Sequence, residues 1–293
     1  MEKENDKVLS VDYEALANGE WDKCQEALSE GILNFAKEVT GRLQNAGYAA
    51  EDISWLQVWP IINGPSWQGA AVRVKDAVIS FNFTVCEPAD EEGMLDMSTA
   101  IGIPDIPMQE HFGFCHENDI IPYEIMLDAS DLSHYNYMEP RLGDDLEENP
   151  GESPFLVGPL SRYKGPGLMS EWEINNAAVQ RTRQYLEGKG VEDFQINDSE
   201  GVFPQILFRD TDGVTKYVFV AGHAVGNPAP EIPEGMVERC QEAGIPGFYV
   251  NLPLANFHGN GDFNDITIPR GSELVGDVRE LIPMEQKLSE TEE

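Results

Sequence analysis

The sequence predicts a mixed α+β fold arranged in two domains. Segments with apolar residues at helical spacing alternate along the chain with short segments in which every second residue is apolar. A stretch rich in proline, glycine and acidic residues separates two such groups. The length of 293 residues is sufficient for two cores. We therefore expect an N-terminal α+β domain over residues 1–138, a linker over 139–170, a C-terminal αβββαβ domain over 171–285 and a flexible acidic tail over 286–293.

The N-terminal domain begins with a predicted helix over residues 21–46, because its apolar side chains recur on one helical face. Gly47 then provides a natural C-terminal stop. Three strands are expected to follow, and the Lys75–Asp76 step predicts a tight hairpin between the last two. The apolar and β-branched residues that predict these strands lie in residues 54–62, 69–75 and 77–85.

The end of this domain has a less regular pattern. Residues 87–110 combine proline, glycine and acidic residues, a composition that favours a loop with one short helix. Residues 118–134 fit two alternatives, a helix interrupted at Pro122 or a strand followed by a helix. The pattern does not distinguish between them.

The C-terminal domain is predicted to start with a helix over residues 171–187. Ser170 is its expected N-cap, and Glu173, three residues later, completes a capping box. Asp210 and Gly213 tolerate the left-handed conformations of a hairpin, so they predict a turn between two strands. The expected strands and the second helix of this domain cover residues 192–197, 203–209, 215–221, 233–243 (the helix) and 247–254.

The two halves share a coarse order of features. Each contains a helix, then a glycine, then strands with an aromatic–proline step, which is Trp59–Pro60 in the first half and Phe203–Pro204 in the second. An internal duplication would explain this order. A helix followed by a meander is common, however, and we favour coincidence.

Charge is the most unusual property of the chain. It has 19 Lys and Arg against 53 Asp and Glu, and the net charge is −34. Such a surface repels the phosphates of nucleic acids and the headgroups of anionic membranes, so we expect neither to bind directly. The acidity has three alternative explanations. They are a solvated acidic surface that maintains solubility, a surface that binds a basic protein partner, and adaptation to high salt. The solvated surface is the favoured explanation.

Targeting and cofactor signals are missing from the sequence. The N-terminus has no apolar core of a signal peptide, and no segment reaches the apolar length of a membrane span. There is no Walker motif, no GxGxxG after a strand and no zincin helix, so no cofactor is expected. The cysteines are far apart and form no CxxC pair, which predicts reduced thiols in the cytoplasm: Cys24, Cys86, Cys115 and Cys240.

The hairpin "FPQILFRDTDGVTKYVFV" at residues 203–220, with the order of elements around it, resembles the core of the restriction-endonuclease-like (PD-(D/E)XK) superfamily. In active members an aspartate follows a proline at the start of the second core strand, and the third strand carries an acid-x-Lys triplet. The resemblance implies that these carboxylates hold a divalent metal and that the lysine orients the attacking water.

This chain departs from the family at the residues that carry the chemistry. Gln205 follows Pro204, and the third strand has no acid. Asp210 and Asp212 are better explained as turn residues than as displaced ligands, and His223 is the titratable group near the strand end. The resemblance therefore implies a catalytically silent scaffold.

Three other residues are candidate metal ligands: His111, Cys115 and His116. Imidazole and thiolate bind zinc well, but adjacent Cys and His point apart on regular structure and no second ligand pair follows at familiar spacing. Ordinary core and loop residues are the favoured interpretation. Residues 258–265 alternate oxygen-bearing side chains as calcium loops do, but they lack the glycine and glutamate of such loops, which favours a polar loop.

We therefore expect a non-enzymatic, acidic, cytoplasmic protein that acts through contacts with a protein partner. The more specific form of this expectation is that the partner is basic. Three tryptophans are candidate anchors for that partner, although core packing is more usual: Trp59, Trp67 and Trp172. No catalytic residue is assigned. The alternative is a metal-dependent hydrolase with an unfamiliar site around His111, Cys115 and His116, or around His223.

Overall fold

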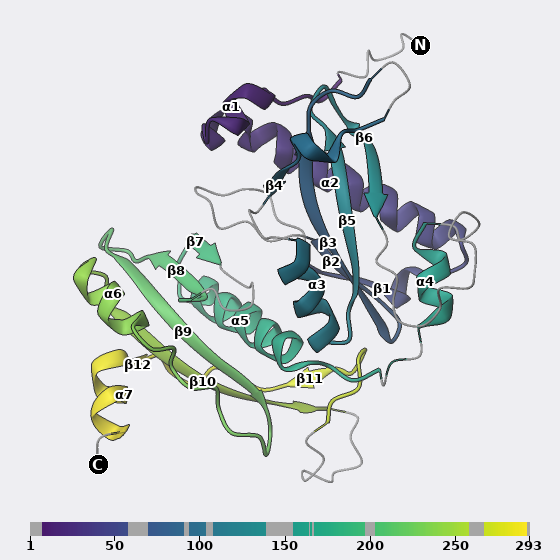
Figure 1. The fold of residues 1–293 in the computed structure, drawn as a ribbon. Coiled ribbons are helices and arrows are strands. Elements are labelled where there is room, and N and C mark those ends of the chain that lie inside the picture. Colours follow the sequence, from purple (N-terminus) through teal and green to yellow (C-terminus); the bar gives the residue numbers. More distant parts are fainter. Residues whose placement is uncertain are drawn as a thin grey trace, which may run out of the picture. The chain divides into compact units, whose positions relative to one another are not determined.

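The structure is a computed structural model of the chain. It describes residues 8–57, 70–90, 94–103, 108–138, 155–163, 165, 167–196, 203–257 and 267–291. The chain folds into two compact units, Met1–Gly165 and Pro166–Glu293, coloured purple to teal and green to yellow in Figure 1. Each unit has a mixed β-sheet with helices packed against it, which confirms the predicted α+β class.

The first unit is built on the strand order β1-β2-β3-β5-β6. Strands β1, β2 and β3 form an antiparallel meander, β5 runs parallel to β3, and β6 returns antiparallel to β5. The short β4 pairs with β3. The elements are α1 (Tyr13–Ala17), α2 (Trp21–Asn45), η1 (Ala50–Asp52), β1 (Ile53–Gln57), β2 (Ala70–Val74), β3 (Ala77–Cys86), η2 (Met97–Thr99), β4 (Ile101–Ile103), α3 (Met108–Glu117), β5 (Ile121–Asp128), β6 (Asp131–Met138) and α4 (Val157–Arg162).

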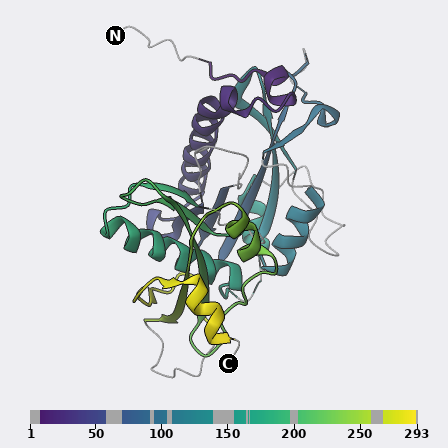
Figure 2. The ribbon, with the colours of Figure 1, turned by 90° about the vertical axis from the view of Figure 1, so that its left-hand side faces the viewer.

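Helices α2 and α3 cover opposite faces of this sheet (Figure 2). Alternate side chains of β3 point to opposite faces, as the pleat requires. Phe81 and Phe83 therefore both meet Phe35 of α2, with ring centroids 5.2 Å apart and edge-to-face geometry. The predicted helix at 21–46 and the hairpin at Lys75–Asp76 are confirmed by α2 and by the β2–β3 pairing.

Of the two alternatives for residues 118–134, the strand followed by a helix is correct for its strand, β5, but a second strand, β6, occupies the place of the expected helix. All eight residues of β5 are buried, because the strand is central and both of its faces are covered. The alternation that identifies a half-buried strand is therefore absent from its sequence. Pro122 lies near the start of the strand, where its missing N–H is tolerated.

Two backbone contacts join the segment before α1 to the β5–β6 turn and to the start of β6, the outermost strand. The Leu132 N–H donates to the carbonyl of Leu9, and the Val11 N–H donates to the carbonyl of Ala129, each at 2.8 Å. The segment before α1 thus runs beside the first residues of this outermost strand.

The second unit has the strand order β11-β10-β9-β8-β7, with β12 also paired to β10. Strands β7, β8 and β9 form an antiparallel meander and β10 runs parallel to β9. The capping box predicted at Ser170 and Glu173 is present at the start of its first helix. The elements are α5 (Glu171–Gly188), β7 (Asp193–Ile196), β8 (Ile206–Arg209), β9 (Thr215–Ala224), α6 (Met236–Glu242), β10 (Gly247–Asn256), β11 (Leu274–Val275), β12 (Ile282–Pro283) and α7 (Met284–Thr291).

Helix α5 packs very closely on β9. A Cβ atom at Gly222 would lie 2.4 Å from the Cβ of Ala178, so only glycine fits this contact. The same helix carries Glu173, whose carboxylate accepts from Nε of Arg270 at 3.0 Å and from Nη2 at 2.7 Å. The Glu173 and Arg270 side chains are 2% and 0% exposed, so this ion pair is buried.

The structure differs from the expected linker and tail. Residues from 286 onward, expected to be a flexible tail, belong to α7 as far as Thr291, and Met284 at the start of that helix is buried. Met284 and Leu288 are one helical turn apart and pack on the same apolar cluster. Within the expected linker, Phe155 and Leu156 belong to the core of the first unit. Both segments were predicted from their polar composition, which does not reveal the few apolar residues that pack in a core.

The two units share one topology. Each has a helix, a three-stranded antiparallel meander, a crossover helix and a fourth strand parallel to the third: α2-β1-β2-β3-α3-β5 and α5-β7-β8-β9-α6-β10. Within this order the first unit adds η1, η2 and β4, and after the fourth strand the first sheet continues with β6 whereas the second adds β11 and β12. The shared topology thus extends the coarse order of features found in the sequence of the two halves to the pairing of the strands.

Candidate functional site

Gln205 occupies the position after the proline, where the nuclease-like family has a metal-binding aspartate. Its side chain is buried and pairs with the backbone of Val220 in β9. The Gln205 Nε2 donates to the Val220 carbonyl at 3.1 Å, and its Oε1 accepts from the Val220 N–H at 3.0 Å. The amide therefore joins the segment before β8 to β9 as a backbone ladder would. Both of its polar atoms have a structural role.

The two aspartates of the following hairpin lie at the turn. One Asp210 oxygen accepts from the N–H groups of Asp212 and Val214, at 3.0 and 2.9 Å. The other carboxylate oxygen pairs with Lys216, and this hydrogen bond lowers the pKa of Asp210. The predicted hairpin is confirmed.

His223, at the far end of β9, contacts neutral oxygens. Its Nδ1 lies 3.1 Å from the Ala224 carbonyl, and its Nε2 lies 2.9 Å from Oδ1 of Asn251. These contacts hold the ring in place. They bring no carboxylate to it.

The three candidate zinc ligands are not brought together. His111 and Cys115 are one turn apart on the buried side of α3, whereas His116 is exposed. Within the ranges that the structure describes, no group of three His, Cys, Asp or Glu side chains is arranged to hold a metal ion.

His111 instead belongs to a polar network on the α3 face of the first sheet. Its Nδ1 lies 2.9 Å from Oε1 of Glu124, and its Nε2 lies 3.0 Å from Oγ of Ser80. Asn82 donates to the other Glu124 oxygen at 2.9 Å. Ser80 and Asn82 share a face because they are two residues apart in β3, and Glu124 is opposite Asn82 in β5. Burial raises the pKa of Cys115, also beside Ser80, to about 12.

The contacts run from serine to histidine to carboxylate, the order found in serine hydrolases. Such enzymes also need donors aimed at a developing oxyanion. Ser80 lies in the middle of β3 with Ala71 and Pro122 opposite it, so its backbone belongs to the sheet. We interpret the network as the set of polar contacts that fixes α3 on the sheet.

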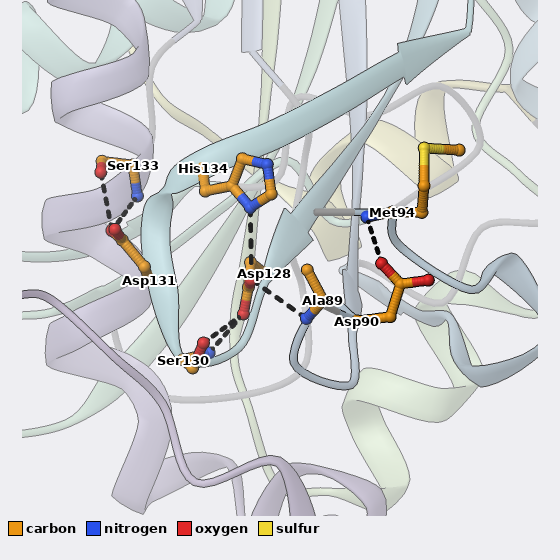
Figure 3. A network of polar contacts seen from close by, with 8 residues as sticks. All are labelled: Ala89, Asp90, Met94, Asp128, Ser130, Asp131, Ser133 and His134. Carbon is orange, nitrogen blue, oxygen red and sulfur yellow. Dashed lines mark hydrogen bonds and ion pairs between the residues drawn. The ribbon is translucent and has the colours of Figure 1, made fainter. Parts of the chain in front are cut away.

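A second polar centre lies at the other end of β5 (Figure 3). One oxygen of Asp128 accepts from the N–H and the hydroxyl of Ser130, both at 2.7 Å. The other accepts from the Ala89 N–H at 3.1 Å and lies 3.3 Å from Nδ1 of His134. Burial alone would raise the pKa of Asp128, but these hydrogen bonds outweigh it and lower the pKa. The ionised carboxylate thus ties the segment after β3 to the β5–β6 hairpin.

The segment after β3 is fastened at further points. The Asp90 carboxylate accepts from the Met94 N–H at 2.9 Å, and the Asp90 N–H donates to the Met94 carbonyl at 3.2 Å. The Glu87 N–H donates to the hydroxyl of Thr99 at 3.1 Å. Despite these contacts, the Met94 side chain remains 62% exposed. The exposed side chain of Met94 is therefore attached to a backbone that hydrogen bonds to Asp90 hold in place.

The sequence signal for the segment after β3 is its local charge distribution. The composition of the whole chain does not show this signal. Between residues 76 and 140 there are fourteen acidic residues and no lysine or arginine. Five of the nine methionines are in the same stretch. The network partners Ser80, Asn82 and Glu124 had no comparable signal, because they meet only in space.

Of the remaining candidates, the structure describes Trp172 alone. Trp59, Trp67 and the loop at 258–265 lie outside the described residues. Trp172 is buried in α5, so core packing accounts for it.

Comparison of the chain with protein-family models, with curated proteins and with solved structures finds no match. Among the described helices, none combines the length and the apolar character needed to cross a bilayer.

Proposed function

We propose that this chain is a non-enzymatic cytoplasmic protein that acts by binding a basic protein partner, and that its C-terminal unit is a catalytically silent, nuclease-like scaffold in a two-domain protein. The observation that carries the proposal is the pairing of Gln205 with Val220. This pairing uses both polar atoms of the Gln205 side chain in contacts within the sheet. Active members of the resembled superfamily have a metal-binding aspartate at this position.

The topology of the second unit supports the scaffold. Its order α5-β7-β8-β9-α6-β10 is the αβββαβ order that the resemblance implies. The third strand, β9, has glycine and histidine near its end. Because Gly222 has no side chain, α5 can pack directly against the backbone of the strand. A sheet covered so closely by a helix is suited to support rather than to substrate entry.

The charge supports the kind of partner. A net charge of −34 disfavours nucleic acid and anionic lipid, and it accelerates encounter with a cationic protein surface. The four free cysteines are all buried, in keeping with a reducing compartment.

The experiment is affinity capture from the native host at physiological salt, followed by reconstitution with the purified partner. We expect a specific basic protein whose association rate falls steeply with ionic strength. The proposal would be overturned if the purified chain degraded nucleic acid with added magnesium or manganese and lost that activity on chelation.

A second candidate, a hydrolase, is favoured by the contacts from Ser80 through His111 to Glu124. A fluorophosphonate probe would label Ser80 if the hydroxyl were activated, and Ser80→Ala would abolish the label. Elemental analysis of protein purified without added metal tests the metal-dependent form at His111, Cys115 and His116. We expect neither labelling nor stoichiometric zinc.

A further inference from the structure

We propose that the first unit carries a docking site for a cationic, amphipathic segment of a protein partner, formed by exposed methionines beside the end of its sheet. This inference rests on the proposed function and assigns it a surface. We call the site the methionine surface and define it by Met94, Met97, Met126, Met138 and Leu95.

The methionine surface has an apolar base. Leu95 and Met126 are buried together with Cys86, and Met138 of β6 packs against this cluster. Met94 and Met97 lie on either side of Leu95 in the chain, with side chains 62% and 44% exposed. Isolated exposed apolar residues are common, but these two flank, in the sequence, a residue of a buried apolar cluster.

The backbone that presents the two methionines is held in place. Asp90 fixes both polar groups of the Met94 backbone, and Asp128 fixes Ala89 (Figure 3). Beyond Met97, the Thr99 hydroxyl donates to the Asp96 carbonyl at 2.7 Å. Because these hydrogen bonds fix the described backbone at Ala89, Asp90 and Met94, a partner would lose little entropy in ordering it.

The charges in the sequence segment that carries the surface have one sign. Glu87, Asp90 and Asp96 are exposed next to the methionines. Hydrogen bonds from the backbone N–H and the hydroxyl of Ser98 lower the pKa of Asp96, which keeps it ionised. No lysine or arginine occurs between Lys75 and Arg141. Within the described part of the chain, Glu87 and Asp96 take part in no ion pair.

These properties specify the chemistry of the occupant. Methionine is flexible and polarisable, so it accommodates apolar side chains of varied shape. Carboxylates at the margin require lysine or arginine on the same ligand. A helix with apolar residues on one face and basic residues on the other meets both demands. We therefore assign this surface to a cationic amphipathic helix of another protein.

The experiment uses the full chain with carbon-13-labelled methionine methyl groups. The probe is a synthetic peptide of about 18 residues, or five helical turns, of leucine and lysine with the leucines on one face. Its control has the same composition with the leucines distributed around the helix. The methyl signals of Met94 and Met97 should shift on adding the first peptide, whereas those of the buried Met236 and Met284 should not.

Variants locate the binding. Met94→Ser/Met97→Ser should weaken binding of the segregated peptide by about tenfold or more, because the apolar contact is lost. The matched control is Val214→Ser/Val275→Ser, which changes side chains that are 45% and 38% exposed in the second unit. It should leave affinity unchanged. All four positions are exposed, so both variants should retain the wild-type unfolding temperature.

The outcomes separate the site from the function. Equal affinity for both peptides, or for the wild type and the methionine variant, would overturn the docking site. If capture still returned a basic partner, the proposed function would stand without this surface. If the chain instead showed metal-dependent degradation of nucleic acid, the proposed function itself would fail.

Discussion

The buried ion pair between Glu173 and Arg270 offers the sharpest test of the second unit. Glu173→Gln keeps an oxygen that can accept from the Ser170 N–H, to which the native carboxylate is bonded at 2.9 Å, so the capping box survives. The charge is lost, however, and the guanidinium of Arg270 stays buried without its carboxylate. Breaking a buried pair in this way costs about 3–5 kcal/mol. Because the amide can still accept one hydrogen bond, we expect the lower end, about 3 kcal/mol.

The matched control is Glu171→Gln, the same change in the same first turn of α5 but at an exposed position. It should cost at most about 1 kcal/mol, the usual size of a charge effect at a helix terminus. Urea unfolding with amide hydrogen exchange, read on peptides from α5 and β9, reports the free energy of unfolding of this unit. Equal destabilisation by the two variants would refute the reasoning that the pair is buried and coupled. So would additivity of Glu173→Met and Arg270→Met, since contacting residues should couple.

Three further predictions follow from the packing and the titration of single residues. Gly222→Ala should destabilise the second unit by about 1–3 kcal/mol through overpacking, while Gly188→Ala, with open space around it, should be near neutral by the same measurement. Asp128→Asn should lower the free energy of unfolding at pH 7. Because the native pKa of Asp128 is lowered, the difference from wild type should shrink as pH falls below about 4, and a constant difference would contradict this. In native protein treated with iodoacetamide, Cys115, with a pKa of about 12, should be alkylated last and Cys240, the most exposed of the four, first, as peptide mapping would reveal.

Local signals predicted the elements that depend on local chemistry. Helix α2 and the capping box of α5 were found from a periodic apolar face and from the Ser170–Glu173 pair. The hairpin turns at Lys75–Asp76 and after Asp210 needed only the residues of the turn.

Elements that depend on distant contacts were missed or left undecided between alternatives. Strand β5 lacks alternation because sheet neighbours and helices bury both of its faces, a property set by the fold rather than by the segment. Helix α7 has one apolar pair, Met284 and Leu288, in an otherwise polar segment, and this pair belongs to an apolar cluster with residues of β9, β10 and α6.

The candidate sites show the same division. Gln205 was singled out by its position after Pro204, but its pairing with Val220 appears only in the sheet. His111 was noted for its zinc-binding chemistry. Its actual partners, Ser80 and Glu124, come from two other elements of the fold.

The backbone contacts from Leu9 and Val11 to the start of β6 have a practical consequence for handling the protein. An outermost strand with unpaired N–H and C=O groups is a template on which a second chain can add, and proteins commonly cover such strands. A version truncated beyond residue 11 would lose this cover and should self-associate in a concentration-dependent manner. Purification tags are therefore better fused ahead of the intact N-terminal segment than in its place.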